Sequence, residues 1–360
     1  MRLPVLFALC MIVLARESAA QAIEFVRRIG VVDGDPNYVF ARPGQIRELP
    51  DGNILVIEAL DAQLRIYDAE GRFVRSFGGR GAGPGEFLMP FGIIARDSLL
   101  EIIDASLRRI TTYTVSGRYV TDRPLPAWPV SALSTVRPLQ YGFAITAANA
   151  RYGSGGVFLD VNVQLLREND ARVDTLLTYP SGVVVRRDGS NVRSTTPRLG
   201  EGGAWASSGD SMVVVMDALR GVVTWYWVDR GGLREWRRSD LRWRPETVSR
   251  ADRAEIEDRV RSTQPELRAA SLDLIMPDSW GRVSRMVVAG DGTAWLNLTA
   301  RLERTNDWLL IAPGGRETRR VALPERFSLW SVAGDRLYGV ERGEDDVPFV
   351  VIYRLPDTSR

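Results

Sequence analysis

The sequence predicts an all-β fold: a six-bladed β-propeller of four-stranded blades, closed by an N-terminal strand that joins the last blade, with one helical insertion. Three observations lead to this prediction. A module of about 40 to 50 residues, which reads as four strands joined by turns, recurs along the chain. The last module is one strand short, and a strand without a module precedes the first. A helical pattern interrupts the modules once, after the fourth of them.

The first module, residues 44–82, shows the pattern most clearly. An expected inner strand leads through a Pro-Asp-Gly-Asn turn to a second strand that ends at Glu58. A third strand at 64–67 and a turn follow, and the fourth strand at 73–77 ends in a glycine-rich connection. Such a unit cannot bury both faces alone, so its copies must pack against one another.

The later modules repeat this order with more variation. The second strand ends in an acid in blades two, four and six, whereas blade three is looser and blade five has Asn297-Leu298 where the acid is expected. The blades are predicted at about 44–82, 90–125, 131–180, 203–244, 282–324 and 327–355.

The two ends of the chain complement each other. The last module contains only three strands of its own, and the strand at 24–29 belongs to no module. Pairing strand 24–29 with the last module would close the ring and leave no open sheet edge for association with other chains.

Two segments interrupt the modules around blade four. Residues 180–203 are expected to form a polar loop that enters the blade, and residues 245–281 form an insertion that leaves it. Within the insertion, Ser249 followed by Asp252 resembles a helix cap, and apolar residues at helical spacing predict a helix over 249–263. Both segments are expected on the face where the second strands end.

Residues 1–22 read as a signal peptide, with Arg2, an apolar run at 3–14 and small residues before the expected cleavage point. The run is too short for a membrane span, which needs about 20 apolar residues. The one cysteine, Cys10, lies within it. We therefore expect an exported propeller over 23–356, periplasmic or extracellular, without disulfides or a transmembrane segment.

Composition narrows the possible chemistry. The chain has 47 basic and 45 acidic residues, so its charge gives no reason to expect a nucleic-acid partner; a monomer is expected. All basic residues are arginines, since the chain contains neither His nor Lys. A Ser-His-Asp or Cys-His centre, a His-ligated metal and a Schiff base are therefore excluded. Carboxylates, hydroxyls, Arg and oxygen-ligated Ca²⁺ or Mg²⁺ remain.

Blades one and two resemble the NHL-repeat family, whose repeats combine a short apolar strand ending in Asp with Arg-Ile, an aromatic residue and a glycine turn. Ile103-Asp104 with Arg109-Ile110 and Tyr113 fits this pattern, and blade one fits it with Glu58 in place of Asp. Blades three to six depart from it. The resemblance implies a secreted bacterial six-bladed propeller, in a family that includes lyases, protein-interaction modules and RNA binders. Fold alone does not choose among these activities.

The acids at the second-strand ends are the first candidate site: Glu58, Asp104, Asp217 and Glu341, with Asn149 and Asn297 near the equivalent places. One hypothesis is an acidic ring at the channel mouth that binds a ligand or holds Ca²⁺, with Asp104 and Asp217 as metal ligands. The alternative is that these acids cap turns and pair with nearby arginines such as Arg65, Arg109 and Arg342.

Tryptophans near the starts of inner strands are the second candidate. Trp280 and Trp330, with Trp128 and Trp205, could stack on a ligand at the channel mouth, or they could fill the wedges between blades.

Two functions remain open on the sequence. The favoured one is an exported binding or interaction module, with the segments around blade four shaping its recognition face. The other is a hydrolase or lactonase that uses a divalent cation and no histidine. No catalytic residue is identified.

Overall fold

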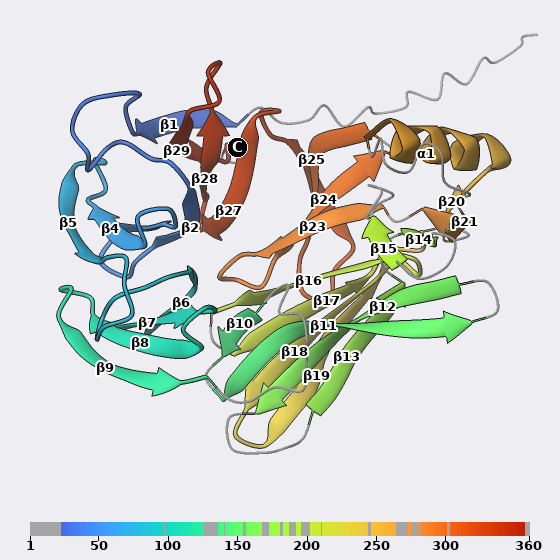
Figure 1. Ribbon diagram of the computed structural model, residues 1–360, viewed down its shortest axis with the longest axis horizontal. Coiled ribbons are helices and arrows are strands. Elements are labelled where there is room, and N and C mark those ends of the chain that lie inside the picture. Colours follow the sequence, from blue (N-terminus) through green and yellow to red (C-terminus); the bar gives the residue numbers. More distant parts are fainter. Residues whose placement is uncertain are drawn as a thin grey trace, which may run out of the picture.

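The computed structural model describes residues 23–356 except 97, 126–135, 140, 154–155, 168–172, 181–182, 187–191, 196–201, 210, 244–245, 264–272, 276–278, 281 and 301–302. Within these residues, six antiparallel four-stranded sheets lie in a ring (Figure 1). The predicted fold class is confirmed. The predicted signal peptide and Trp128 lie outside the described residues.

The first three blades follow chain order from the inner to the outer strand. Their strands are β2 (Pro43–Glu48), β3 (Ile54–Glu58), β4 (Gln63–Tyr67), β5 (Phe73–Gly78); β6 (Pro90–Arg96), β7 (Leu99–Asp104), β8 (Arg109–Thr114), β9 (Tyr119–Pro124); β10 (Val136–Leu139), β11 (Gly142–Gly153), β12 (Gly156–Arg167) and β13 (Val173–Pro180).

Blades four and five have the same order, and blade six is completed by the N-terminal strand. The strands are β16 (Gly203–Ser208), β17 (Met212–Asp217), β18 (Val222–Asp229), β19 (Gly232–Asp240); β23 (Val283–Val288), β24 (Ala294–Ala300), β25 (Glu303–Ile311), β26 (Glu317–Ala322); β27 (Phe327–Ala333), β28 (Arg336–Arg342), β29 (Pro348–Arg354) and β1 (Glu24–Ile29).

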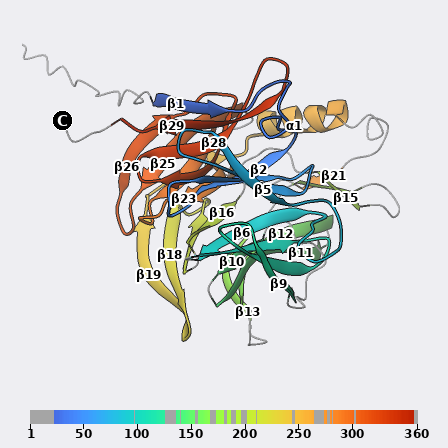
Figure 2. The same ribbon diagram turned by 90° about the vertical axis from the view of Figure 1, so that its left-hand side faces the viewer.

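The N-terminal strand closes the ring by joining the last blade, as predicted from the sequence. Strand β1 pairs antiparallel with β29 along most of its length, and Figure 2 shows the two side by side. The first and last segments of the described chain therefore share one sheet, which removes two open edges.

Apolar side chains fill the spaces between neighbouring blades. In β3, Leu55 and Ile57 pack toward blade two, whereas Ile54 and Val56 pack toward blade six. Alternation of side chains along a strand produces this division. Each of the six described core clusters combines residues from two adjacent blades, so the core is distributed around the ring.

The helix predicted after blade four is confirmed as α1 (Arg250–Thr263). It begins with reciprocal capping: the Asp252 amide donates to Ser249 Oγ at 3.1 Å, and the Ser249 amide donates to Asp252 Oδ2 at 2.8 Å. These bonds satisfy two donors that the first helical turn would leave unpaired. Among the described residues, no helix has the length and apolar character needed to cross a membrane.

The segment 180–203 is more than the polar loop expected from sequence. It contains β14 (Val183–Arg186) and β15 (Val192–Thr195), and β14 also pairs with β21 (Asp273–Ile275) from the second insertion. The valine run of β14 favours a strand, but its second partner lies about ninety residues away in sequence. A further short pair, β20 (Glu246–Thr247) and β22 (Ser279–Trp280), closes the second insertion. The two insertions therefore form one joint structure.

Candidate functional site

The acidic ends of the second strands mark one face of the ring, called here the mouth face. On this face the strands β3, β7, β17 and β28 end at or beside Glu58, Asp104, Asp217 and Glu341, and the connections between blades arrive. In blades one, two, four and six, the residue after the acid donates its amide to a carbonyl just before the inner strand. The acids thus occupy equivalent positions, as the repeat predicts.

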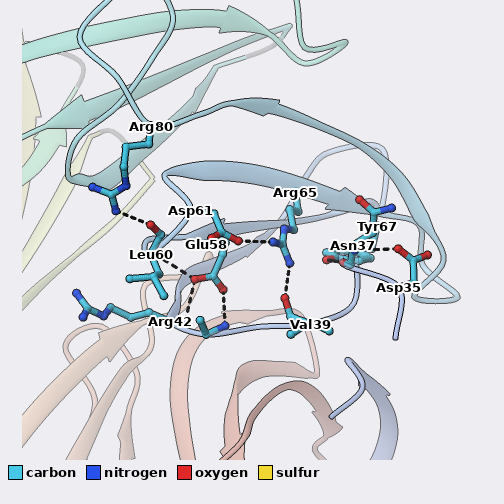
Figure 3. Close-up of polar contacts among 11 residues, drawn as sticks. Asp35, Asn37, Val39, Arg42, Glu58, Leu60, Asp61, Arg65, Tyr67 and Arg80 are labelled. Carbon is cyan, nitrogen blue, oxygen red and sulfur yellow. Dashed lines mark hydrogen bonds and ion pairs between the residues drawn. The ribbon is translucent and has the colours of Figure 1, made fainter. Parts of the chain in front are cut away.

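Glu58 is fully buried and caps the backbone of blade one. Its carboxylate accepts amide hydrogens from Ala41 at 3.1 Å, Arg42 at 2.8 Å and Leu60 at 3.2 Å (Figure 3). Two of these donors precede β2 and the third lies in the turn after β3. One carboxylate therefore joins the incoming connection to the outgoing turn.

Asp104 repeats this arrangement in blade two and is also fully buried. Its Oδ2 accepts from the amides of Leu88 at 2.7 Å and Met89 at 3.0 Å, and its Oδ1 accepts from Leu107 at 2.8 Å. A carboxylate with three backbone donors is well compensated for its burial. The capping alternative raised by the sequence thus describes the observed contacts of Glu58 and Asp104.

The other two acids are less enclosed. Asp217 Oδ1 accepts from the amides of Leu219 at 3.2 Å and Arg220 at 2.9 Å, and its Oδ2 forms a 3.5 Å ion pair with the exposed Arg220. Glu341 accepts a hydrogen bond from the Tyr353 hydroxyl at 2.6 Å. Burial, and then this bond to a carboxylate, raise the pKa of Tyr353 well above its ordinary value.

The three arginines that the sequence suggested as partners, Arg65, Arg109 and Arg342, do not pair with these acids. Arg65 donates to the Val39 carbonyl and to Asp61, both at 2.7 Å (Figure 3). Arg109 reaches the carbonyls of the glycine-rich connection and pairs with Asp122 at 3.1 Å, and Arg342 pairs with Asp346. The expected pairing of the acids with these arginines is therefore wrong, because the guanidinium groups instead hold connections and turns.

Exposed apolar side chains surround the buried acids of blades one and two. Three of the residues whose amides donate to Glu58 and Asp104 are apolar and exposed: Leu60, Leu88 and Met89, at 46%, 37% and 55% exposure. We call these three residues the apolar rim. Arg80 donates to the Leu60 carbonyl, and its own backbone forms a β-bridge with Phe87, the residue before Leu88. Sequence reasoning missed the rim, although apolar residues directly beside capped turns were a visible signal.

The amide residues near the acid positions differ from one another. Asn149 lies on β11, where it pairs in register with Asp160. In blade five, Asn297 pairs in register with Trp308 and donates to the Asp307 carbonyl at 3.3 Å. Strand β11 continues with β12 well past the point where β13 ends. Blade three therefore extends beyond the regular module on this side.

The tryptophans have separate surroundings. Trp280 lies on β22 and is 2% exposed. Trp205 donates its indole N–H to Thr146 across the boundary between blades three and four at 2.8 Å. Trp330 is half-buried on the inner strand β27, with the guanidinium carbon of Arg285 4.9 Å from its ring centroid. The packing alternative describes Trp205, Trp280 is buried on a strand that pairs within the second insertion, and Trp330 faces a cation.

Among the described residues, no three acidic side chains form a set that could hold a metal ion. The carboxylates of Glu58 and Asp104 are directed at backbone amides, and Glu341 is directed at a phenol. The assignment of Asp104 and Asp217 as Ca²⁺ ligands remains a prediction, as do the ligand-binding roles of Glu58, Glu341, Trp280 and Trp330.

Comparison with known proteins agrees with this architecture. Residues 37–158 match the model of the DUF5128 family, which is described as a 6-bladed beta-propeller. The chain is a six-bladed β-propeller. None of the curated proteins compared with it matches.

Solved structures are similar over nearly the whole chain. A protein from Bacteroides fragilis NCTC 9343, inferred to be exported, gives a TM-score of 0.51 at 13% identity and covers 95% of this chain and 97% of its own. A DUF4221 member from Bacteroides vulgatus ATCC 8482 gives 0.49 at 9% identity, with 95% and 100% covered. The calcium-binding protein regucalcin from Agrobacterium tumefaciens gives 0.41 at 13% identity, with 92% and 96% covered. At these identities the likeness concerns the fold alone.

Proposed function

We propose that this chain is an exported binding module that recognises a protein partner through the mouth face of blades one and two. The observation that carries the proposal is the apolar rim, three exposed apolar side chains held on backbone that buried carboxylates fix in place. Binding residues on loops that a rigid scaffold positions are a common arrangement in recognition proteins.

The physical argument concerns what a preorganised rim contributes to association. Ordering a loop on binding costs conformational entropy, which lowers affinity. The backbone of the rim residues is ordered beforehand, because Glu58 at the end of β3 holds the Leu60 amide and Asp104 at the end of β7 holds those of Leu88 and Met89. Leu60, Leu88 and Met89 then offer apolar surface, and association removes such surface from water. A partner with a complementary apolar segment is the expected ligand.

Export is the second component of the proposal. It rests on the basic, apolar and small-residue pattern of residues 1–22, and the B. fragilis protein with the same fold is itself inferred to be exported. Cell fractionation of the full chain should give a periplasmic or extracellular product that lacks these residues. Retention of the full-length chain in the cytoplasm would contradict export.

The binding proposal is tested by site-specific photo-cross-linking in the native host. A photoreactive residue in place of Met89 should give a defined cross-linked product that Leu60→Ser weakens. The matched control is Val120, which is 41% exposed on the outer strand β9. A product of the same mass from position 120, or a product from position 89 that Leu60→Ser leaves unchanged, would contradict recognition through the rim.

A further inference from the structure

The inner strands around the axis of the ring carry an excess of positive charge. The six inner strands, β2, β6, β10, β16, β23 and β27, contain four arginines and one carboxylate: Arg47, Arg96, Arg137 and Arg285 against Glu48. Glu48 accepts a hydrogen bond from the Tyr338 hydroxyl of blade six, so its charge is already directed at another blade. Such an excess of arginines over carboxylates is unexpected in a chain whose overall charge is only +2.

Three of these arginines come from alternate blades. Arg47 lies on β2 of blade one, Arg137 on β10 of blade three and Arg285 on β23 of blade five. Figure 1 shows these strands on three different sides of the axis. The three arginines therefore lie on inner strands that border the axis from separate sides, an arrangement that the sequence order of the residues does not suggest.

Arg285 has the most informative surroundings of the three. Its guanidinium carbon lies 4.9 Å from the ring centroid of Trp330, which is the extra residue at a register shift in β27. Bulges of this kind redirect a side chain and are frequent beside functional sites. Among the described residues, none accepts a hydrogen bond or forms an ion pair with Arg285. Arg47 and Arg137 have further partners of their own.

The charges of these arginines influence one another in two pairs, Arg285 with Arg137 and Arg137 with Arg47. Burial, and then the charge of Arg137, lower the pKa of Arg285 to about 10. Burial, and then the charge of Arg47, lower the pKa of Arg137. Each side chain nevertheless keeps part of its surface exposed, so a small solute can reach it. Repulsion among cations that are partly removed from water destabilises the ligand-free protein. Attraction between a bound anion and these cations would offset that repulsion.

We propose that the axis of the propeller binds a small anion with carboxylate or phosphate groups between Arg47, Arg137 and Arg285, with Trp330 supporting the Arg285 guanidinium. Planar guanidinium groups match both kinds of oxyanion through paired hydrogen bonds. The indole face fixes the plane of Arg285 and so prepares it for the ligand. This site lies on the inner strands and does not depend on the apolar rim.

Thermal unfolding with defined anions tests the site on the mature chain. Citrate and inorganic phosphate are titrated at constant ionic strength, with chloride as the reference salt, and dissociation constants are measured by calorimetry. A ligand that binds only the folded protein raises the melting temperature. We expect citrate, phosphate or both to raise it, and Arg285→Gln and Arg137→Gln to weaken binding by about tenfold or more, because each variant removes charged hydrogen bonds.

The control is Arg237→Gln, because Arg237 also lies over an indole, with its guanidinium carbon 5.1 Å from the Trp236 centroid, but is exposed on the outer strand β19. This variant should keep the full anion response. In chloride alone, Arg285→Gln should unfold at the wild-type temperature or above it, since it removes repulsion. A response to citrate alone assigns a carboxylate ligand, and one to phosphate alone a phosphate ligand. No response, or an equal response in all variants, would overturn the proposal.

Discussion

Replacing the two acids that the sequence proposed as metal ligands should have very different effects on stability. In Asp104, both oxygens are used: Oδ2 accepts from two amides and Oδ1 from a third, and the side chain is fully buried. In Asp217, a single oxygen accepts from both amides, and the other faces the exposed Arg220 at 3.5 Å. An asparagine has only one acceptor oxygen, so the two sites respond differently.

The size of each stability loss follows from the number of backbone amides that lose their acceptor. Asp104→Asn directs an NH₂ group at one or two buried backbone amides in either orientation, and each unsatisfied buried donor costs about 1–3 kcal/mol. We expect the free energy of unfolding to fall by about 2–4 kcal/mol. At least one backbone amide loses its acceptor, and the new NH₂ group then faces that amide, donor against donor. Asp217→Asn keeps its accepting oxygen and loses an exposed ion pair, which is worth about 1 kcal/mol or less.

Urea unfolding followed by tryptophan fluorescence measures both variants, with and without added Ca²⁺. If the acids are backbone caps, the variants differ by about 1–4 kcal/mol in stability, and Ca²⁺ changes neither the wild type nor the variants. The cation-site hypothesis makes the opposite prediction. Calcium would raise the stability of the wild type, and both substitutions would abolish that gain. This second result, or equal destabilisation by both substitutions, would refute the capping argument.

Two further predictions concern local features. Tyr113 donates its hydroxyl to the Gly85 carbonyl, and burial, followed by the charge of Asp122, raises its pKa from 10.0 to about 12. Its contribution is therefore complete below pH 10 and is lost as the pH rises toward 12, so Tyr113→Phe should be less stable than the wild type at pH 8 by about 1 kcal/mol. Its melting temperature should also fall less steeply between pH 10 and 12, and parallel curves would contradict this. Ser249→Ala should weaken the start of α1 by about 1 kcal/mol and accelerate amide exchange there, while the exposed Asp258→Ala serves as the control. Unchanged exchange at the helix start would show that the cap is dispensable.

The fold was predictable because its signals are local and repeated. The apolar second strands, the Gly-containing turns and the unmatched strand at 24–29 are each visible in a short window of sequence. Repetition averages out the departures in blades three and five, since neighbouring modules must pack in the same way. The capped helix start at Ser249 is equally local, because both partners lie within one turn.

The candidate site was less predictable. The equivalence of Glu58, Asp104, Asp217 and Glu341 was correct in position, but sequence could not show which atoms their oxygens face. Three amides on Glu58 come from residues up to seventeen positions away. The partner of an acid depends on the path of the connecting loops, and that path is set by the packing of whole blades.

The sequence by itself determined the architecture of this protein: the module, the ring closure, the helix and the absence of histidine chemistry. These follow from periodicity and composition, which act over a few residues at a time. Tertiary structure alone decided the rest. It joined β14 to β21 from two distant insertions, turned the acids inward onto backbone amides, and placed Arg47, Arg137 and Arg285 on inner strands of alternate blades. The ring brings together residues more than two hundred positions apart, so charges that are scattered in the sequence become neighbours only when it closes.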